Sequence, residues 1–293
     1  TERLPSTEGA DGATADIDRV DTATRVRRLI EAQRGAIDAA LAASDAIAHA
    51  VDAVVTALRS GRRVIVLGAG TSGRLAVLDA SELPPTFGFP AERYHGRIAG
   101  GDGALRRAVE GAEDDAPAGA ASVADAVRGD VVIGVSASGS AAFVAGALAG
   151  ARAAGAVTIA LVNAAGSALA RDADIAIVAE TGAEPIAGST RLRAGTAQKI
   201  VLNTISTAAM IALGKTYRNL MVDVVASNVK LRARALRLVR ELAGDVDAAA
   251  VLDAAGGRVK TAVVMARRKV DRGAAERLLE ESGGRLAGLI DES

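Results

Sequence analysis

The strongest constraint on the fold is the segment from Val64 to Gly73, an apolar run that ends directly in a glycine-rich turn. The run VIVL is short enough to be a buried strand. The turn that follows, GAGTSG, is typical of loops whose backbone N–H groups bind an anion at the start of a helix. An amphipathic helix is expected next, over 73–80. This segment therefore predicts a strand, an anion-binding turn and a helix in direct succession.

Three further apolar runs and one weaker candidate, residues 94–99, have the character of strands, and helical patterns separate them. Strands that alternate with helices imply right-handed crossovers and a mostly parallel sheet covered on both faces. The predicted fold class is α/β, with a doubly wound sheet whose ligands bind beyond the carboxyl ends of the strands. The expected strands are 64–67, 94–99, 131–135, 157–162 and 175–178, and the expected helices between them are 73–80, 103–110, 118–127 and 141–154.

The pattern changes twice along the 293 residues. Residues 1–58 start as a polar, irregular stretch and continue as helix from Arg25 to Leu58, in one or two pieces with a break near Gly35. Residues 59–243 form the α/β domain. Residues 244–293 carry short helices separated by glycine pairs, and predict a small helical subdomain at the C-terminal end. Long helices are expected over 194–213 and 224–242, and short ones over 247–255, 259–269, 273–281 and 286–291.

The composition argues against several classes of function. Cysteine is absent and the only histidines are His49 and His95, so neither thiol chemistry nor a zinc site is expected. Lys plus Arg and Asp plus Glu number 35 each, and aromatic residues make up 2%, which argues against a nucleic-acid surface. No apolar run reaches about 18 residues and the first residues are polar. We expect a cytoplasmic protein that needs no metal or other cofactor.

The GAGTSG turn formally fits the G-x-G-x-x-G pattern of a dinucleotide site, which is weak evidence on its own. A dinucleotide site needs an acidic residue at the end of the second strand, where this chain has Gly100-Gly101. Thr71 and Ser72 instead place two hydroxyls where the turn meets the helix, which suits a phosphate monoester. Gly70, Thr71 and Ser72 are therefore predicted to bind phosphate.

A second serine-rich turn follows the expected strand over 131–135 and leads into another helix. Serine often caps helices, so a single turn of this kind would carry little information. Two such turns after two strong strands can converge on one anion, and they favour a shared sugar-phosphate pocket. The predicted ligands in the second turn are Ser136, Ser138, Gly139 and Ser140.

Two carboxylates are candidates for acid–base chemistry. Glu82 precedes Pro84-Pro85, which should end the helix and fix its last side chain. Glu113 lies in an acidic run that could equally be solvated surface. Two carboxylates in unlike environments can divide the roles of acid and base. From these residues alone, the reaction could be an isomerisation, an elimination or a hydrolysis.

A polar loop over 182–199 enters a long helix and supplies the remaining candidates. Ser189 or Thr190 could cap that helix. Arg191 and Lys199 could meet a carboxylate or phosphate, or could hold the loop together. The predicted substrate-binding residues of this segment are Glu184, Ser189, Arg191 and Lys199.

Four long motifs carry a resemblance to a known family. They are LGAGTSGRLAVLDASELPPTFG, AVEGAEDD, GAEPIAGSTRLRAGTAQKIVLN and NLMVDVVASN, and they resemble those of the N-acetylmuramic acid 6-phosphate etherases. The similarity extends over nearly the whole chain, from Thr7-Glu8-Gly9 to the C-terminal helices. The family belongs to the sugar isomerase (SIS) fold class and is more distantly similar to the glucokinase regulatory protein.

The resemblance implies a lyase of peptidoglycan recycling. Its substrate would be a phosphorylated amino sugar, N-acetylmuramic acid 6-phosphate, which with water gives N-acetylglucosamine 6-phosphate and D-lactate. Glu82 matches the family's proton donor to the leaving lactate, and Glu113 matches its second catalytic glutamate, which we assign as the base at C2. A homodimer with its pocket near the subunit interface is also implied. The alternatives are a non-catalytic sugar-phosphate regulator of the glucokinase-regulator type and a SIS-fold aldose–ketose isomerase.

The chain departs from the family pattern at three places. Ala141 stands where SIS turns have a threonine, which removes one hydroxyl contact to phosphate unless Ser140 supplies it. Arg193 replaces a lysine of the Ser-Thr-Arg-x-Lys run and keeps the charge but not the geometry. Asn163-Ala164 lacks a proline that is often found there.

Overall fold

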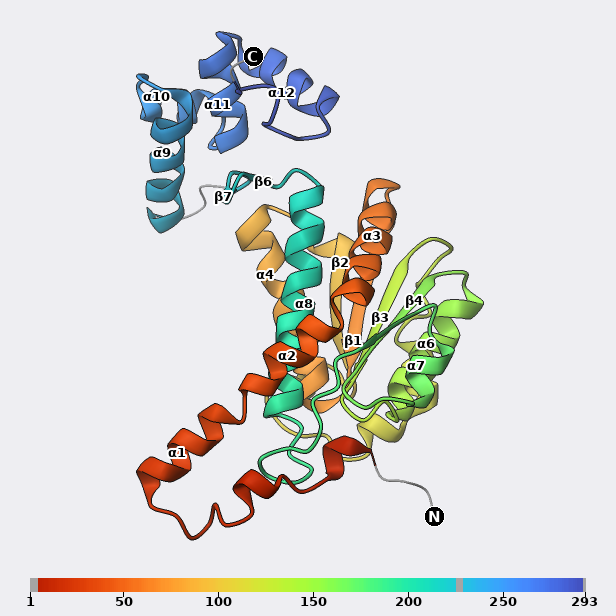
Figure 1. Cartoon of the computed structure of the whole chain (residues 1–293). Helices are drawn as coiled ribbons and strands as arrows, with labels where there is room; N and C mark the ends of the chain where they lie inside the picture. Colours follow the sequence, from red (N-terminus) through yellow and green to blue (C-terminus); the bar gives the residue numbers. More distant parts are fainter. Residues whose placement is uncertain (1–4, 225–228, 292–293) are drawn as a thin grey trace. The chain divides into compact units, whose positions relative to one another are not determined.

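The computed structural model describes residues 5–224 and 229–291, which form two compact units (Figure 1). Unit 1 comprises residues 1–81 and 92–206, and unit 2 comprises residues 82–91 and 207–293. The start of the helix predicted over 224–242 and the end of the NLMVDVVASN motif lie outside the described residues.

Unit 1 is built on a five-stranded parallel sheet with the order β2-β1-β3-β4-β5. The central strands β1 and β3 are buried at every position, which explains their continuous apolar sequence. The predicted fold class is confirmed, and each strand agrees with its predicted range to within one residue. The strands are β1 Val64–Gly68, β2 Tyr94–Ile98, β3 Val131–Ser136, β4 Val157–Val162 and β5 Ile175–Val178.

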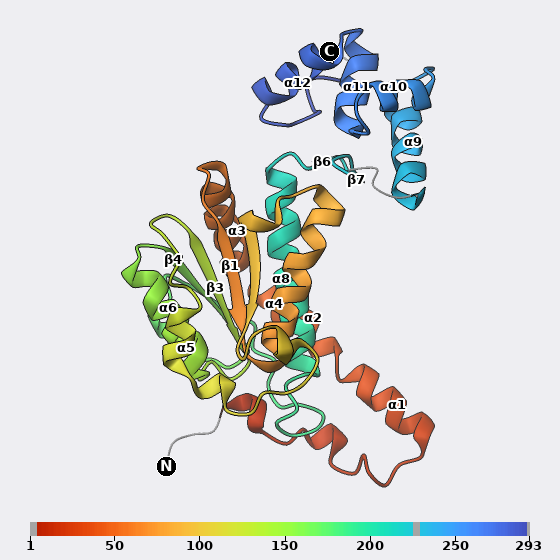
Figure 2. The same ribbon diagram turned by 180° about the vertical axis from the view of Figure 1, so that it is seen from behind.

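The strand order reverses between β1 and β3, because the chain moves from β1 outward to β2 and later from β3 outward to β4 and β5. Right-handed crossovers in opposite directions place their helices on opposite faces of the sheet. Helices α3, α4 and α8 cover one face, and α5, α6 and α7 cover the other (Figure 2). Their bounds are α3 Ser44–Arg59, α4 Gly70–Phe87, α5 Ala116–Ala121, α6 Ala142–Ala153, α7 Ala168–Asp172 and α8 Arg193–Ala212.

The N-terminal helical region consists of three helices, where one or two pieces were predicted. These are α1 Thr22–Glu31, α2 Arg34–Ala42 and α3. Gly35 lies inside α2, so the predicted break near it is displaced to the residues just before α2. The Ala32 carbonyl accepts a hydrogen bond from Arg193 there, which stabilises the break. Among the described residues no single helix is long and apolar enough to cross a membrane. Of these residues, only the pair 22–42 and 44–59, which is bent at the break between the two segments, is long and apolar enough when both are counted together.

Three predicted helices are shorter than expected or absent. The segment expected over 103–110 holds only a 3-10 turn, Asp102–Leu105, and the helix expected over 118–127 ends at Ala121. Residues 286–291 form turns around a buried Leu286. Each of these segments is rich in helix-favouring alanine or leucine, but packing and glycine-defined turns override that propensity.

Unit 2 has its own apolar core, to which helices α9 to α12 contribute. Helix α9 belongs to this core through Leu238 and Val239, although its residues were assigned to the α/β domain by sequence. Buried Lys260 pairs with Asp223 at 2.9 Å, and burial lowers the pKa of the lysine. The elements are a hairpin of β6 Thr216–Tyr217 and β7 Leu220–Met221, followed by α9 Val229–Ala243, α10 Ala248–Ala254, α11 Val259–Arg268 and α12 Arg272–Glu281.

Candidate functional site

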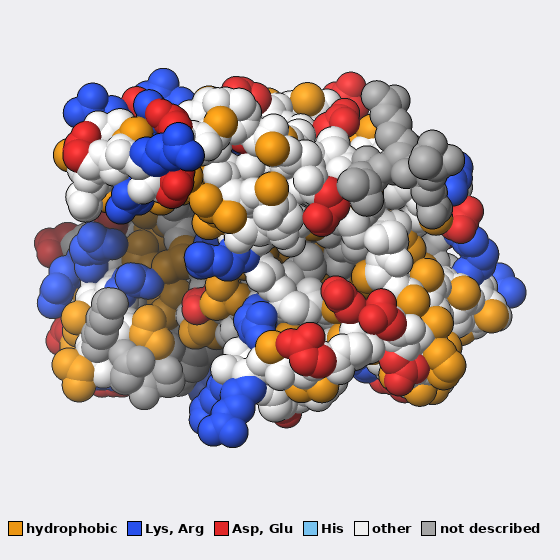
Figure 3. Space-filling model, turned by 90° about the horizontal axis from the view of Figure 1, so that it is seen from below, with side chains coloured by type: hydrophobic (Ala, Val, Ile, Leu, Met, Phe, Trp, Pro, Cys, Tyr) orange, Lys and Arg blue, Asp and Glu red, His pale blue; other side chains and the backbone are white. Residues whose placement is uncertain are grey.

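A cavity of about 490 Å³ opens beyond the carboxyl ends of β1 and β3, where the strand order reverses. This is the position at which doubly wound sheets bind their ligands. Figure 3 views this end of the molecule and shows a hollow in largely uncharged surface, with acidic side chains near its margin. The walls are residues 69–72 after β1, residues 135–138 and 140–141 after β3, Glu113 and Asp114, and a fourth wall of Pro5, Glu8, Gly188 and Thr190.

The turn after β1 is shorter than predicted, because α4 already begins at Gly70. The helix was expected only from Gly73. A Cβ at Gly73 would lie 2.5 Å from the Gly68 carbonyl oxygen and 2.6 Å from Cγ1 of Ile98. Only glycine lets the first turn of α4 approach the sheet this closely. The first N–H groups of a helix lack partners within it, so this contact brings anion-binding groups to the cavity.

Ser72 links three elements through a buried hydrogen-bond chain. Its hydroxyl donates to Oε1 of Gln198 at 2.9 Å, and Nε2 of Gln198 donates to Oδ1 of Asn163 at 2.8 Å. Nδ2 of Asn163 in turn donates to the Ala179 carbonyl at 2.8 Å. The Ser72 proton is therefore engaged within the protein, although the residue lines the cavity. This series of hydrogen bonds also gives Asn163 a structural role, because its side-chain amide links Gln198 to the Ala179 carbonyl.

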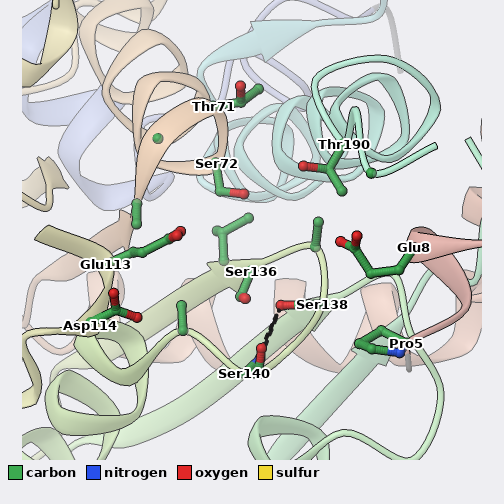
Figure 4. A pocket seen from close by; sticks show the side chains of 16 residues that line it. Pro5, Glu8, Thr71, Ser72, Glu113, Asp114, Ser136, Ser138, Ser140 and Thr190 are labelled. Atoms are coloured by element: carbon green, nitrogen blue, oxygen red, sulfur yellow. Dashed lines mark hydrogen bonds between the residues drawn. The ribbon is translucent and has the colours of Figure 1, made fainter. Parts of the chain in front are cut away.

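The turn after β3 leaves two of its three hydroxyls accessible, those of Ser138 and Ser140. Ser136 is buried, and its Oγ accepts from the Gly139 N–H at 3.1 Å. Ser138 and Ser140 bring their hydroxyls within 2.8 Å of each other at the edge of the cavity (Figure 4). Gly139 has a φ of +70° and does not line the cavity, so its contribution is conformational. Ala141 is the N-cap of α6 and offers no side-chain hydrogen bond.

Glu113 and Glu8 extend their carboxylates into the cavity from opposite sides (Figure 4). Glu113 lies on a 3-10 turn, Ala112–Asp114, that follows Gly111 in the left-handed region at φ +73°. Glu8 packs against Gly188, where a Cβ would lie 3.0 Å from its Oε2. Glu8, Pro5 and Thr190 were not predicted to be site residues, because no local sequence pattern marks them. Among the described residues no group of three or more His, Cys, Asp or Glu is arranged to hold a metal ion.

Glu82 does not line this cavity. It is exposed and belongs to unit 2, whereas the residues that line the cavity belong to unit 1. The prediction that Pro84-Pro85 end the helix is wrong, since α4 continues to Phe87 and the Gly88 N–H donates to the Pro84 carbonyl at 3.0 Å. Pro84 and Pro85 lack an N–H, so the helix loses the hydrogen bonds to the carbonyls four residues earlier, those of Ala80 and Ser81, but it continues beyond them.

The predicted residues of the 182–199 loop do not line the cavity. Gly188 and Thr190 are the residues of this loop that do. Glu184 is fully buried and accepts from the N–H groups of Arg193 and Ala194, both at 2.8 Å. It therefore caps α8. Lys199 is exposed and donates to Oδ1 of Asn203. Ser189 and Arg191 are likewise absent from the cavity wall.

Asp79 is a buried carboxylate that joins α4 to α8 and β2. It accepts hydrogen bonds from Asn203 at 2.7 Å, Ser206 at 2.9 Å and Tyr94 at 3.4 Å. Burial raises the pKa of Asp79, although these three donors oppose the shift. Burial and the neighbouring Asp79 together raise the pKa of Tyr94 well above its usual value. The cluster fixes α4 behind the cavity wall.

Arg193 ties the N-terminal segment to the loop that faces it. Its Nε donates to the Ala32 carbonyl at 2.6 Å, its Nη1 to the Ala183 carbonyl at 2.7 Å, and its Nη2 to Asp11 at 2.8 Å. A lysine has a single terminal nitrogen and could not reach these three directions. The departure from the family pattern at this position thus adds contacts to the wall that holds Glu8.

The parallel sheet and the cavity at its order reversal are of the doubly wound type, and two family models identify SIS domains within the chain. The SIS domain model matches residues 110–208, and the model of the glucokinase regulatory protein N-terminal SIS domain matches residues 46–152. A phosphoheptose isomerase from Francisella tularensis superposes with a TM-score of 0.51 at 24% identity, over 66% of this chain and 100% of that chain. The structure of E. coli CFT073 c3406 in complex with A5P gives a TM-score of 0.50 at 19% identity, and the match covers 68% of this chain and 96% of that chain. These likenesses concern the fold alone.

Whole-chain relatives define the family more narrowly. An N-acetylmuramic acid 6-phosphate etherase of Deinococcus radiodurans is 49% identical over 282 residues, which cover 95% of this chain and 92% of that protein. One of Gloeobacter violaceus is 48% identical over 300 residues, or 99% and 98% of the two chains. The chain belongs to the N-acetylmuramic acid 6-phosphate etherase family, and the resemblance seen in its motifs is confirmed.

Proposed function

We propose that this protein is a carbon–oxygen lyase that cleaves the D-lactyl ether of N-acetylmuramic acid 6-phosphate. The products are N-acetylglucosamine 6-phosphate and D-lactate. The observation that carries the proposal is the cavity at the strand-order reversal, where Glu113 faces two turns able to bind phosphate. We further propose that the reaction serves peptidoglycan recycling in the cytoplasm.

Phosphate is proposed to bind between the two turns. Ser138, Ser140 and Thr71 offer hydroxyls, and the start of α4 offers N–H groups. None of the described residues that line this cavity is Lys or Arg, so binding here would depend on neutral donors and the helix dipole.

The chemistry follows from the position of the ether, which lies at C3, beta to the aldehyde carbon of the opened sugar. Glu113 is proposed to remove the C2 proton, which leaves an enolate. A general acid then protonates the ether oxygen, the C3–O bond breaks, and lactate leaves a C2–C3 double bond behind. Water adds its oxygen to C3, and a proton returns to C2. General acid–base catalysis of this kind contributes about 10²–10⁴-fold to the rate.

Glu82 remains our proposal for the general acid, acting from a second copy of the chain. Glu82 is exposed and is not among the residues that line the cavity of its own chain. A homodimer with the site at its interface would bring Glu82 of the partner subunit to the cavity instead. Glu8 is the alternative acid, because it already lies in the cavity of the same chain.

The decisive assay incubates the protein with N-acetylmuramic acid 6-phosphate in heavy-oxygen water. We expect release of D-lactate, with the heavy oxygen in the amino sugar and none in the lactate. A regulator that only binds sugar phosphates would release no lactate, and that result would refute the proposal. An aldose–ketose isomerase would exchange the C2 proton without cleaving the ether.

The roles of the glutamates are separated by variants. Glu82→Gln should block lactate release more than C2 proton exchange, whereas Glu113→Gln should block both. Mixing these two inactive variants should restore about a quarter of wild-type activity if the site is shared, since half of the dimers are mixed and each has one intact site. No recovery, together with loss of lactate release in Glu8→Gln, would assign the acid to Glu8.

A further inference from the structure

A second, smaller cavity of about 170 Å³ adjoins the first. The two share Ala69, Gly70 and Glu113 as lining residues, so Glu113 stands on their common wall. The remaining wall of the smaller cavity is mostly small and apolar, with Ala99, Ala104, Ala108 and Ala112. The proposed role of the two turns in binding phosphate leaves this side cavity without an assigned ligand.

Arg74 is the feature that distinguishes the side cavity. It lies one helical turn after Gly70 on α4 and is the only Lys or Arg among the described residues that line either cavity. Its Nε donates to the Leu105 carbonyl at 3.2 Å, which holds the guanidinium plane. In the described part of the chain its two terminal nitrogens have neither an ion-pair nor a hydrogen-bond partner within contact distance.

We propose that Arg74 binds the carboxylate of the lactyl group and that the side cavity is the lactyl subsite. This inference rests on the proposed function. The substrate carries two anions, a phosphate on C6 and the lactyl carboxylate attached through C3. The two adjoining cavities offer two anion sites of different chemistry: neutral donors at the serine turn, and a guanidinium at Arg74.

The position of Glu113 fits this assignment. If Glu113 takes the C2 proton, C2 and the neighbouring C3 lie at the wall that the two cavities share. The lactyl group on C3 then extends into the side cavity, and C6 with its phosphate extends toward Ser138 and Ser140. The small alanine side chains leave room for the lactyl methyl group.

A cation is required in the side cavity because two carboxylates, Glu110 and Glu113, also line it. A lactyl carboxylate beside them would be repelled without a compensating charge. Guanidinium is suited to this role, since it can bind a carboxylate with two parallel hydrogen bonds. Once the ether is cleaved, neither product spans both anion sites, which favours release of both.

The test compares substrates with and without the lactyl charge. The substrates are N-acetylmuramic acid 6-phosphate and its lactyl carboxamide, and the enzymes are the wild type, Arg74→Met, Arg74→Lys and the control Arg107→Met. Arg107 is exposed in the nearby segment and lines neither cavity. We expect Arg74→Met to lower kcat/KM for the acid by about 10–100-fold, the loss of one charge-assisted hydrogen-bonded pair.

The same variant should change kcat/KM for the carboxamide less than about twofold, and Arg74→Lys should fall between wild type and Arg74→Met for the acid. Affinity for N-acetylglucosamine 6-phosphate, measured by calorimetry, should not change in any variant. The wild type itself should prefer the acid over the carboxamide by about 10–100-fold, a comparison that needs no variant.

Equal losses for acid and carboxamide would overturn the assignment, because they would show that Arg74 acts on Glu113 or on the fold. A parallel loss of affinity for N-acetylglucosamine 6-phosphate, or an equal effect of Arg107→Met, would also overturn it. Failure of the proposed function is a separate result, namely no lactate from the wild type. In that case, calorimetric binding of N-acetylmuramic acid 6-phosphate by wild type and Arg74→Met still decides whether Arg74 holds the carboxylate.

Discussion

The turn after β1 is closely packed, whereas the turn after β3 is open to the cavity. Residues 70–73 form the first turn of α4, with Gly73 against β1 and the Ser72 hydroxyl bonded to Gln198. After β3, by contrast, α6 begins only at Ala142, and the hydroxyls of Ser138 and Ser140 bond to each other. The first turn thus contributes backbone groups held by packing, and the second contributes side chains. Substitutions in the first turn should therefore mainly lower stability, whereas substitutions in the second turn should mainly weaken phosphate binding.

The largest effect is expected in the packed turn, from Gly73→Ala. A Cβ there would collide with the Gly68 carbonyl and with Ile98, so the free energy of unfolding should fall by about 3 kcal/mol or more. Gly70→Ala is the control, since its Cβ would meet nothing within 4 Å and only the φ of +53° opposes it. That control should cost about 1–2 kcal/mol. Chemical denaturation measures both, and equal losses would contradict close packing at Gly73.

The double variant Ser138→Ala/Ser140→Ala should damage binding rather than stability. Loss of two hydroxyl donors should weaken affinity for N-acetylglucosamine 6-phosphate by about 10–100-fold. The melting temperature should hardly change, because neither hydroxyl holds another element in place. Calorimetry measures the affinity, and Ser81→Ala, an exposed helical serine outside the cavity, is the matched control. Unchanged affinity would place phosphate elsewhere.

Ser72→Ala should show the opposite pattern. Removal of its hydroxyl leaves Oε1 of buried Gln198 without that donor, so unfolding free energy should fall by about 1–2 kcal/mol. Phosphate affinity should change less than about threefold, since the N–H groups of α4 remain. Thermal unfolding and calorimetry on one preparation test both parts. A large loss of affinity with unchanged stability would show that Ser72 binds phosphate directly.

The smallest effect is a gain, from Ala141→Thr. Ala141 is the N-cap of α6 and makes no side-chain cap bond, so a threonine hydroxyl should add about 1 kcal/mol to the unfolding free energy. It should also supply a further donor near Ser140. Ala141→Val, which has a similar shape but no hydroxyl, controls for the added bulk. If both variants behave alike, the missing cap is of no consequence.

The sheet could be predicted closely because its strands, apart from β2 with the sequence YHGRI, are largely apolar runs bounded by polar or glycine residues. β1 and β3 are buried at every position, and their sequences show it directly. The position of the cavity follows from the same pattern, since the two serine-rich turns lie at the reversal of strand order. These features depend on local sequence and on general rules for parallel sheets.

The rest of the site depends on contacts between distant segments, which local patterns do not encode. Glu8 reaches the cavity by packing against Gly188, and nothing around Glu8 signals that contact. Glu184 caps a helix that begins nine residues later, beyond the spacing of a capping box. Glu82 was expected at a helix end beside the site, but α4 continues past Pro84 and Pro85, and Glu82 does not line the cavity. The catalytic roles of Glu82 and Glu113 remain predictions.

The contact between Arg193 and Asp11 has a consequence for how the protein is made. The two residues are 182 positions apart, so Asp11 leaves the ribosome long before its partner exists. The cavity wall that includes Glu8 therefore cannot be fixed in place until residue 193 has been synthesised. The part of the site that is synthesised first is thus among the last to become ordered. Contacts this distant in sequence slow folding. The turn after β1 is completed equally late, because the Ser72 hydroxyl bonds to Gln198, 126 positions further along the chain.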